Sequence, residues 1–246
     1  MDTQEGRSVP YSRFKDSPRP SPWNLPFPRL DEKQHFFAKC NMIPSAVGSA
    51  YMEVEKTKVM CCVTRPLETP ASADGPEGSR ATPGALAVTV RYAPYAKRER
   101  IHRTRRDAAL EEESKIKRFV QIGFGPVVLL SCYPSSQIEL TISVLQDDGN
   151  ALIAALNCST LALASGKIEM YDLLISGTMV FPTAHSEKAV LTVSTMLALE
   201  QFCFVHMEGE VTESEFREAL ETLRHLLATM VYPVMRSTLI DFIKDE

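Results

Sequence analysis

LQDDGNALIAALNCSTLALA, residues 145–164, joins the end of a strand-like run to a run of strong helix formers. An Asp-Asp-Gly turn lies between the two runs, and Asn150 precedes the apolar run, as a helix N-cap residue does. A free helix N-terminus behind a tight glycine turn is a place where proteins bind phosphate. The residues that would surround an anion here are Ala151, Leu152 and Ile153, which carry neither charge nor a polar side chain. The stretch therefore leaves two possibilities, a turn that holds phosphate and a turn that once belonged to a site of that kind.

The composition of the 246-residue chain is that of an ordinary globular protein, with 44% hydrophobic and 24% charged residues. Its formal net charge of −4 excludes a general electrostatic attraction to nucleic acid, so such binding needs a local basic patch. The N-terminus has no apolar signal region, and no apolar run approaches the roughly 18 residues of a membrane span. We therefore expect an intracellular, soluble protein without a membrane partner.

Sequence motifs for cofactors and metals are absent. The six cysteines form no CxxC pair, and most lie in apolar runs, which is typical of small hydrophobic residues in a reducing compartment. The five histidines are scattered without metal spacing, and no GxSxG, GxGxxG or Walker pattern occurs. We therefore expect no cofactor and no metal site.

Changes in composition divide the chain into an arm and one domain. Residues 1–35 are rich in proline and have no period, which predicts an extended N-terminal arm. Residues 36–246 carry the strand and helix patterns of a single domain. Within it, residues 67–84 are small, polar and rich in Pro and Gly, which predicts a mobile insertion.

The periodicity of the domain predicts an α+β fold. The expected strands are 48–54, 57–64, 85–94, 135–146, 171–181, 188–196 and 201–208, and the expected helices are 107–124, 150–165 and 212 to about 240. Glu55-Lys56 is a poor turn pair for the first hairpin, since neither residue readily takes a positive φ. The last helix starts with a Thr212-x-x-Glu215 capping box, and Pro233 should kink or split it. This order of runs favours a compact α+β domain over a doubly wound parallel sheet.

One segment of this acidic protein, RYAPYAKRERIHRTRRD (91–107), is strongly basic. Its candidate RNA-binding residues are Lys97, Arg98, Arg100, Arg103, Arg105 and Arg106. Tyr92 and Tyr95 are interleaved aromatic residues, and single-stranded RNA needs both positive charge and stacking faces. The alternative interpretation is a solvated linker before the helix.

Three stretches resemble the RNase PH-like family in their order along the chain. They are GSAYMEVEKTKVMCCVTRP (48–66), the basic segment with RYAP and RRD (91–107), and the run from GPVVLLSCYP to KIEMYDLL (125–174). The resemblance extends from about residue 36 to the C-terminus. It implies a single RNase PH-like domain, with a βαβα core of mixed sheets packed with helices and a long C-terminal helix.

The resemblance also implies where phosphorolytic chemistry would lie. Active members of the family cut RNA from its 3′ end with inorganic phosphate, and their turn continues from a second Gly into Thr-Arg or Ser-Arg. Here that place is a degenerate phosphate site, in which Asn150 replaces the Gly, Ala151 the hydroxyl residue and Leu152 the Arg.

Two further differences concern catalysis and RNA contact. The family's catalytic aspartates follow the strand that matches 171–181, where this chain reads PTAHSEKAVLTV, with Glu187 as the only nearby carboxylate. An arginine on the family's first helix, which contacts RNA in active members, is Gln121 here. We therefore expect no catalytic residue, and the chain is predicted not to be a nuclease.

The resemblance then implies a non-catalytic structural subunit of the RNA exosome ring. Such a subunit forms a heterodimer with another RNase PH-like subunit within a six-membered ring, is capped by RNA-binding subunits, and contacts RNA at the channel entrance. The alternative is an active phosphate-dependent 3′→5′ exoribonuclease, and a third interpretation is a free RNA-binding protein outside any ring. The resemblance also implies a location in the nucleus and nucleolus, and in the cytoplasm.

Overall fold

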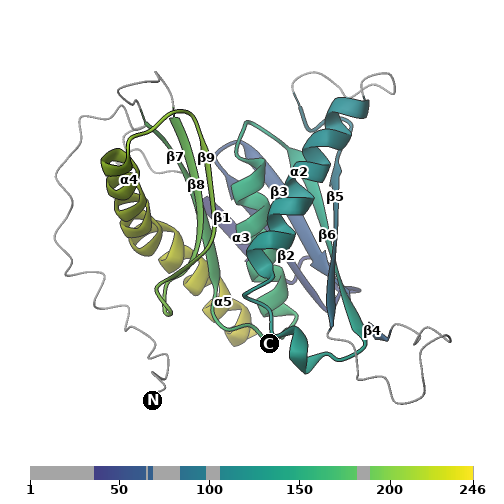
Figure 1. Cartoon of the computed structure of the whole chain (residues 1–246). Helices are drawn as coiled ribbons and strands as arrows, with labels where there is room; N and C mark the ends of the chain where they lie inside the picture. Colours follow the sequence, from purple (N-terminus) through teal and green to yellow (C-terminus); the bar gives the residue numbers. More distant parts are fainter. Residues whose placement is uncertain (1–35, 65, 69–83, 98–105, 182–188, 246) are drawn as a thin grey trace, which may run out of the picture.

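The structure is a computed structural model that describes residues 36–64, 66–68, 84–97, 106–181 and 189–245 (Figure 1). The predicted arm at 1–35 and all but the ends of the predicted insertion at 67–84 lie outside the described residues. The described part forms an α+β fold of two sheets packed with helices, which confirms the predicted fold class.

The larger sheet has six strands. They are β1 (Phe36–Cys40), β2 (Gly48–Val54), β3 (Thr57–Val63), β4 (Leu67–Glu68), β5 (Ala85–Tyr92) and β6 (Ser136–Gln146). Antiparallel pairing runs in the order β1-β2-β3-β6-β4, and β5 pairs with β6 in parallel. Alternate residues of β3 and β6 are buried, so the sheet turns one face towards the helices.

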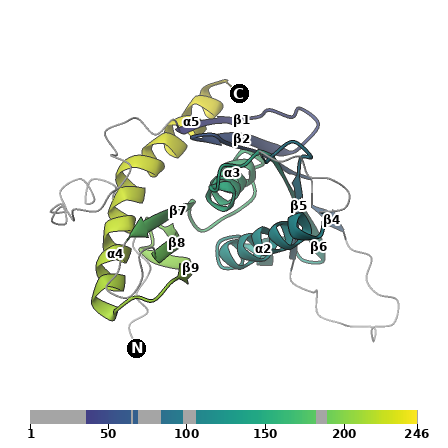
Figure 2. The ribbon, with the colours of Figure 1, turned by 90° about the horizontal axis from the view of Figure 1, so that it is seen from above.

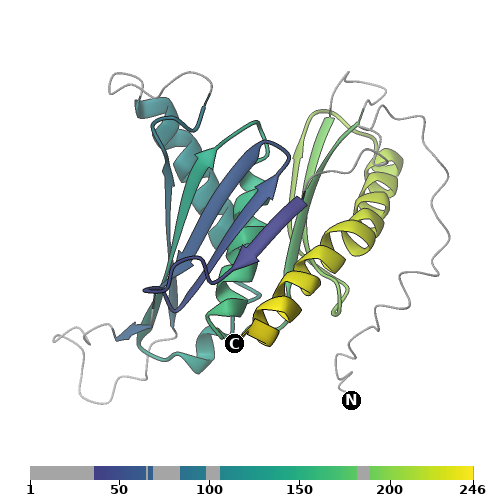
Figure 3. The ribbon, with the colours of Figure 1, turned by 180° about the vertical axis from the view of Figure 1, so that it is seen from behind.

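The smaller sheet consists of β7 (Leu174–Phe181), β8 (Ala189–Met196) and β9 (Gln201–Glu208), all antiparallel. Helix α4 (Glu213–Leu226) packs on β7 and β8, and α5 (Tyr232–Asp245) continues to β1 at the edge of the larger sheet (Figure 3). A short 3-10 turn, η2 (Leu130–Cys132), precedes β6.

Helix α3 (Ala151–Ser165) lies between the two sheets, with α2 (Arg106–Phe124) beside it (Figure 2). Twelve of its 15 residues are buried, as expected for a helix that is apolar on every side. Its packing on β2 is so close that a Cβ at Gly48 would lie 2.2 Å from the carbonyl oxygen of Ala162. This central helix therefore packs against both sheets.

The first hairpin forms despite its unfavourable turn. Glu55 takes a φ of 54°, in the left-handed region that its side chain disfavours, and Lys56 completes the turn. The seven residue pairs between β2 and β3, from Gly48↔Val63 to Val54↔Thr57, offset that strain because they bury one face of the hairpin against α3.

The C-terminal helix starts as predicted. The Thr212 side chain accepts a hydrogen bond from the Glu215 N–H, and the Glu215 carboxylate accepts one from the Thr212 N–H, which completes the capping box. Near Pro233 the helix widens into a π turn, η3 (Leu227–Val231), and does not break. A proline lacks the N–H of the regular ladder, and a local π turn is a common way for a helix to absorb such a defect.

By length and composition alone, the continuous helix Glu213–Lys244 could cross a membrane. A single helix of this kind is weak evidence for a membrane protein. Its apolar stretch is interrupted by charged and polar residues, which is why uninterrupted runs in the sequence did not identify it.

Candidate functional site

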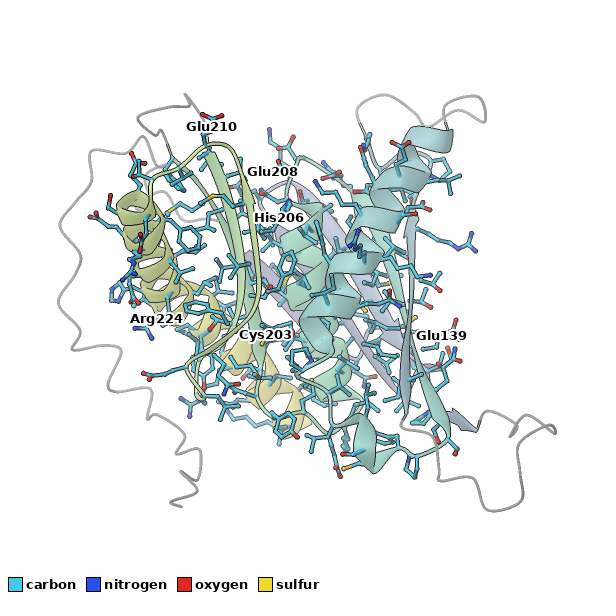
Figure 4. The ribbon with its side chains drawn as sticks, in the orientation of Figure 1. Glu139, Cys203, His206, Glu208, Glu210 and Arg224 are labelled. Atoms are coloured by element: carbon cyan, nitrogen blue, oxygen red, sulfur yellow. The ribbon has the colours of Figure 1, made fainter. Side chains whose placement is uncertain are left out.

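A cavity of about 580 Å³ lies where the first turn of α3 meets α2 and the smaller sheet. Its walls are the Asp147–Gly149 turn, the first residues of α3, one face of α2, and residues of β7, β8 and β9. Figure 4 shows two wall residues of β9, His206 and Glu208, on the side of the small sheet that faces α2. The stretch that predicted a degenerate phosphate site therefore lies at a cavity.

The turn before α3 is built as the sequence indicated. Gly149 has a φ of +100°, which glycine adopts without strain, and its N–H donates to Asp147 Oδ1 at 2.8 Å. Asn150 occupies the predicted N-cap position, but its side chain makes no capping hydrogen bond. Its ψ of 17° departs from the extended conformation that a side-chain cap requires. The first turn of α3 is thus left without a side-chain cap.

The side chains of that first turn are apolar and line the cavity. Ala151 is only 4% exposed, and Leu152 and Ile153 are half-buried. None of the three can donate a hydrogen bond from its side chain. The α3 end of the cavity therefore offers a ligand backbone N–H groups and hydrocarbon.

Lys97, the first member of the predicted RNA-binding set, lines the same cavity and is already paired. Its Nζ donates to both carboxylate oxygens of Glu112 on α2. The same ammonium lies 5.5 Å from the centroid of the Tyr92 ring, within cation–π range. Lys97 therefore has less to offer an RNA phosphate than its sequence context suggested.

A second ion pair joins the α2 wall of the cavity to the β9 wall. Lys115 Nζ on α2 lies 2.8 Å from Glu208 Oε1 on β9, and His206 Nε2 lies 3.0 Å from the same oxygen. Phe119 packs beside them, with its ring centroid 4.8 Å from that of His206. Hydrogen bonds from Lys115 and His206 lower the pKa of the Glu208 carboxyl, so this group is ionised at neutral pH.

The two tyrosines of the basic segment differ in availability. Tyr92 is half-buried, its hydroxyl donates to Asp147 Oδ2 at 3.3 Å, and its N–H donates to Glu113 Oε1 at 2.8 Å. Burial, followed by the nearby Asp147 charge, raises the pKa of Tyr92 well above its usual range. Tyr95 is 68% exposed, so its ring is the one that could stack on a base.

Most of the other predicted site residues lie elsewhere. Arg98, Arg100, Arg103 and Arg105 lie outside the described residues, as do Glu187 and the rest of 182–188. Arg106 is the first residue of α2. Gln121 is exposed on α2 and does not line the cavity.

Sequence reasoning missed Lys115, His206 and Glu208. The pair Lys115–Glu208 joins positions 93 residues apart, and neither residue stands in a motif. The alternation of β9 places positions 206 and 208 on one face of the strand, and this was the only indication in the sequence that His206 and Glu208 lie together.

In the described part of the chain, no group of three His, Cys, Asp or Glu residues could hold a metal ion. All six cysteines are free. Cys61 and Cys158 lie in the core, where burial raises their pKa values, and Cys132 is exposed. Buried thiols of this kind behave as small hydrophobic residues.

Comparison with known protein families gives a match over more than half of the chain. Residues 32–169 match the model of the 3′ exoribonuclease family, domain 1 (RNase PH). The human protein Exosome complex component MTR3 is 34% identical over 231 residues, which cover 83% of this chain and 81% of the human protein. KIEMYDLL (167–174) and the Tyr232-Pro233 pair pointed to this same subunit, messenger-RNA-transport regulator three, and the match confirms that resemblance.

Many solved structures share the fold, and two of them serve as examples. The crystal structure of rice (Oryza sativa) Rrp46 has a TM-score of 0.65 at 17% identity, and covers 86% of this chain and 100% of its own. An Archaeoglobus fulgidus exosome structure with RNA bound to the active site has a TM-score of 0.64 at 20% identity. The match covers 83% of this chain and 89% of the archaeal chain. The arrangement of two sheets around α3 is therefore the fold of these subunits.

Proposed function

This chain belongs to the 3′ exoribonuclease (RNase PH) family, and from that premise we propose that it is a non-catalytic structural subunit of an RNA exosome ring. The proposed role is to form a heterodimer with another RNase PH-like subunit inside a six-membered ring. Supporting this role, the relative with 34% identity is named as an exosome component, and similarity to it spans most of both chains.

The observation that best supports a lack of catalysis is the apolar first turn of α3, which lines the cavity. Leu152 stands where, by resemblance, phosphate-using relatives have an arginine. A hydrogen bond to a charged group contributes about 1.5–3 kcal/mol, and an arginine commonly makes two such bonds to one phosphate. The helix dipole alone contributes about 0.3–1 kcal/mol, which does not replace them.

We also propose that the chain has no general acid at this cavity. Residues 182–188 contain no aspartate, although the family's catalytic aspartates would lie there by resemblance. Among the cavity carboxylates, Glu112 is held by Lys97, and Glu208 has a lowered pKa, which makes it a poor proton donor at neutral pH. General-acid catalysis of about 10²- to 10⁴-fold needs a donor with a pKa near the working pH.

A phosphorolysis assay tests the proposal against an active phosphate-dependent exoribonuclease. The purified chain, incubated with radiolabelled RNA and inorganic phosphate, should release no nucleoside diphosphate. Leu152→Arg alone should not restore activity, because the acid is still absent. A phosphate-dependent product ladder from contaminant-free protein would contradict the proposal.

The partners and the place of action form the second half of the proposal. RNA-binding cap subunits are the proposed neighbours on one face of the ring, and RNA at the channel entrance is the proposed contact of the basic segment (91–107). The proposed locations are the nucleus, the nucleolus and the cytoplasm. Size-exclusion chromatography separates this from a free RNA-binding protein, since in lysate the chain should elute with a complex of several hundred kilodaltons, far above its own 27.4 kDa.

A further inference from the structure

The described walls of the cavity at the start of α3 carry more negative than positive charge. The acidic side chains are Glu112, Asp147, Asp148 and Glu208, and the basic ones are Lys97 and Lys115. This excess of carboxylates lies around the first turn of α3, where the resemblance places the phosphate of active members. It opposes the entry of a phosphate group, because like charges repel across a partly enclosed cavity.

Each lysine of the cavity is bound to a carboxylate of the chain itself. Lys97 bonds both oxygens of Glu112, and Lys115 lies 2.8 Å from Glu208. The lysines and glutamates come from different elements in both cases, since Lys97 follows β5, Lys115 and Glu112 are on α2, and Glu208 ends β9. The two ammonium groups that could attract an anion are thus already paired with carboxylates of the protein.

The apolar side chains of α3 give an anion no hydrogen bond, but they do not repel it. The N–H groups of a helix N-terminus attract anions whatever side chains follow, and this terminus lines the cavity without a side-chain cap. This attraction is weak without an arginine, and an opposing charge removes what is left of it. Among the described residues, Glu112 and Glu208 are the carboxylates that form ion pairs with the two lysines of the cavity.

We propose that Glu112 and Glu208 are built-in counter-ions that exclude inorganic phosphate and phosphorylated ligands from this cavity. The inference rests on the proposed non-catalytic role and deepens it, because it names the residues that set the ligand preference of the silent site. The two carboxylates occupy the lysines that a phosphate would otherwise bind, and the excess charge of Asp147 and Asp148 adds to the repulsion.

The test is phosphate binding by the full-length chain, measured by isothermal titration with inorganic phosphate at low ionic strength. The unaltered chain should show no binding at millimolar phosphate. Glu112→Gln combined with Glu208→Gln frees both lysines and removes two negative charges, and should strengthen phosphate binding at least tenfold. The glutamines keep the shape of the side chains, and both sites are partly exposed, so the fold should be retained.

The matched control is Glu111→Gln combined with Glu200→Gln, which removes the same charge from exposed positions that do not line the cavity. This control should leave phosphate binding undetectable. Equal binding by the unaltered chain and the Glu112/Glu208 variant would overturn the inference, and so would a Glu112/Glu208 variant that folds but still binds no phosphate. Neither result would bear on turnover, which the phosphorolysis assay measures separately.

Discussion

Asn157 on α3 and Ser176 on β7 exchange two hydrogen bonds in the interior of the protein. Asn157 Nδ2 donates to the Ser176 carbonyl at 2.9 Å, and the Ser176 N–H donates to Asn157 Oδ1 at 2.8 Å. Both residues have no exposed surface. The Ser176 hydroxyl continues the network to Ser194 on β8 at 2.8 Å. A polar contact therefore ties the central helix to the smaller sheet in the interior of the protein.

Replacing Asn157 by Ala should destabilise the chain by about 2–6 kcal/mol. The substitution leaves a buried N–H and a buried carbonyl without partners, and each such group costs about 1–3 kcal/mol. The matched control is Asn150→Ala, which should cost less than about 0.5 kcal/mol because that side chain makes no capping hydrogen bond. Urea unfolding of the two variants measures both values, and equal losses would contradict the role of the Asn157–Ser176 pair.

The close approach of β2 to α3 predicts a second stability effect, at Gly48. An added Cβ would meet the Ala162 carbonyl oxygen at 2.2 Å and the Gly166 nitrogen at 2.4 Å, and both are backbone atoms that cannot rotate away. Gly48→Ala should therefore destabilise the chain by about 3 kcal/mol or more, or prevent folding. Gly125→Ala, whose Cβ would make an ordinary contact at 3.4 Å, should be nearly neutral in the same thermal unfolding experiment. Similar losses for both variants would show that the α3–β2 contact can relax.

The sequence predicted the elements of this fold better than their assembly. The alternation in 135–146 and the run of helix formers after Asn150 determine local structure through contacts with near neighbours, and both elements form where expected. β1 (Phe36–Cys40) was missed because five residues give no clear period. The parallel pairing of β5 with β6 depends on packing across α2, which no local pattern records.

The candidate site was predictable only in the part that one stretch of chain supplies. The turn and the apolar start of α3 are consecutive in sequence, so Ala151 and Leu152 could be placed at a helix N-terminus from the residues alone. The charges opposite them come from α2 and β9, and tertiary packing brings Lys115 and Glu208 together. In the sequence Lys97 is one cation of a basic segment, whereas in the structure its ammonium is paired with the Glu112 carboxylate.

The ion pair of Glu208 predicts a small pH dependence of stability. Lys115 and His206 lower the folded-state pKa of Glu208 below its usual value of 4.5. A lowered folded-state pKa gives stability that is present above the unfolded-state pKa and is lost as the pH falls through the folded-state value. Because the pair is about half exposed, its contribution should not exceed about 0.5 kcal/mol.

The measurement compares the unfolding free energy of Glu208→Gln with that of the unaltered chain from acid to neutral pH. The variant should be the less stable of the two at neutral pH, and the difference should vanish well below pH 4.5. Glu111→Gln, on the exposed face of α2, should show no such trend. A difference that persists unchanged in acid would mean that the glutamate stabilises the protein by packing and not by charge.

The basic segment (91–107) predicts salt-dependent RNA binding in the assembled complex. Each phosphate that the protein neutralises on a single strand adds about −0.7 to the slope of log K against log salt. Replacing Arg98, Arg100, Arg103 and Arg105 by Ser should flatten this slope by about one to three units, since some of the four arginines will contact no phosphate. Lys97→Ser should change the slope by much less, because Lys97 is already paired with Glu112. An unchanged slope with an intact ring would indicate a solvated linker, and loss of the ring would place the arginines at a subunit interface.

Base stacking in this segment should come from Tyr95 and not from Tyr92. Tyr95 is 68% exposed, whereas the Tyr92 ring is half-buried beneath Lys97 and its hydroxyl bonds Asp147. Stacking of a base on an aromatic ring contributes about 1–3 kcal/mol. Tyr95→Ala in the assembled complex should therefore weaken the binding of single-stranded RNA by about five- to 150-fold and leave the salt slope unchanged, since no phosphate contact is lost.

The matched variant is Tyr92→Phe, which keeps the ring and its packing and removes only the hydrogen bond to Asp147. It should bind RNA as the unaltered complex does. Fluorescence anisotropy with a labelled homopolymer separates the two contributions, because stacking changes the affinity at every salt concentration and phosphate contacts change the slope. If Tyr95→Ala binds RNA normally while Tyr92→Phe does not, the Tyr92–Asp147 contact matters for RNA binding and the exposed ring of Tyr95 does not.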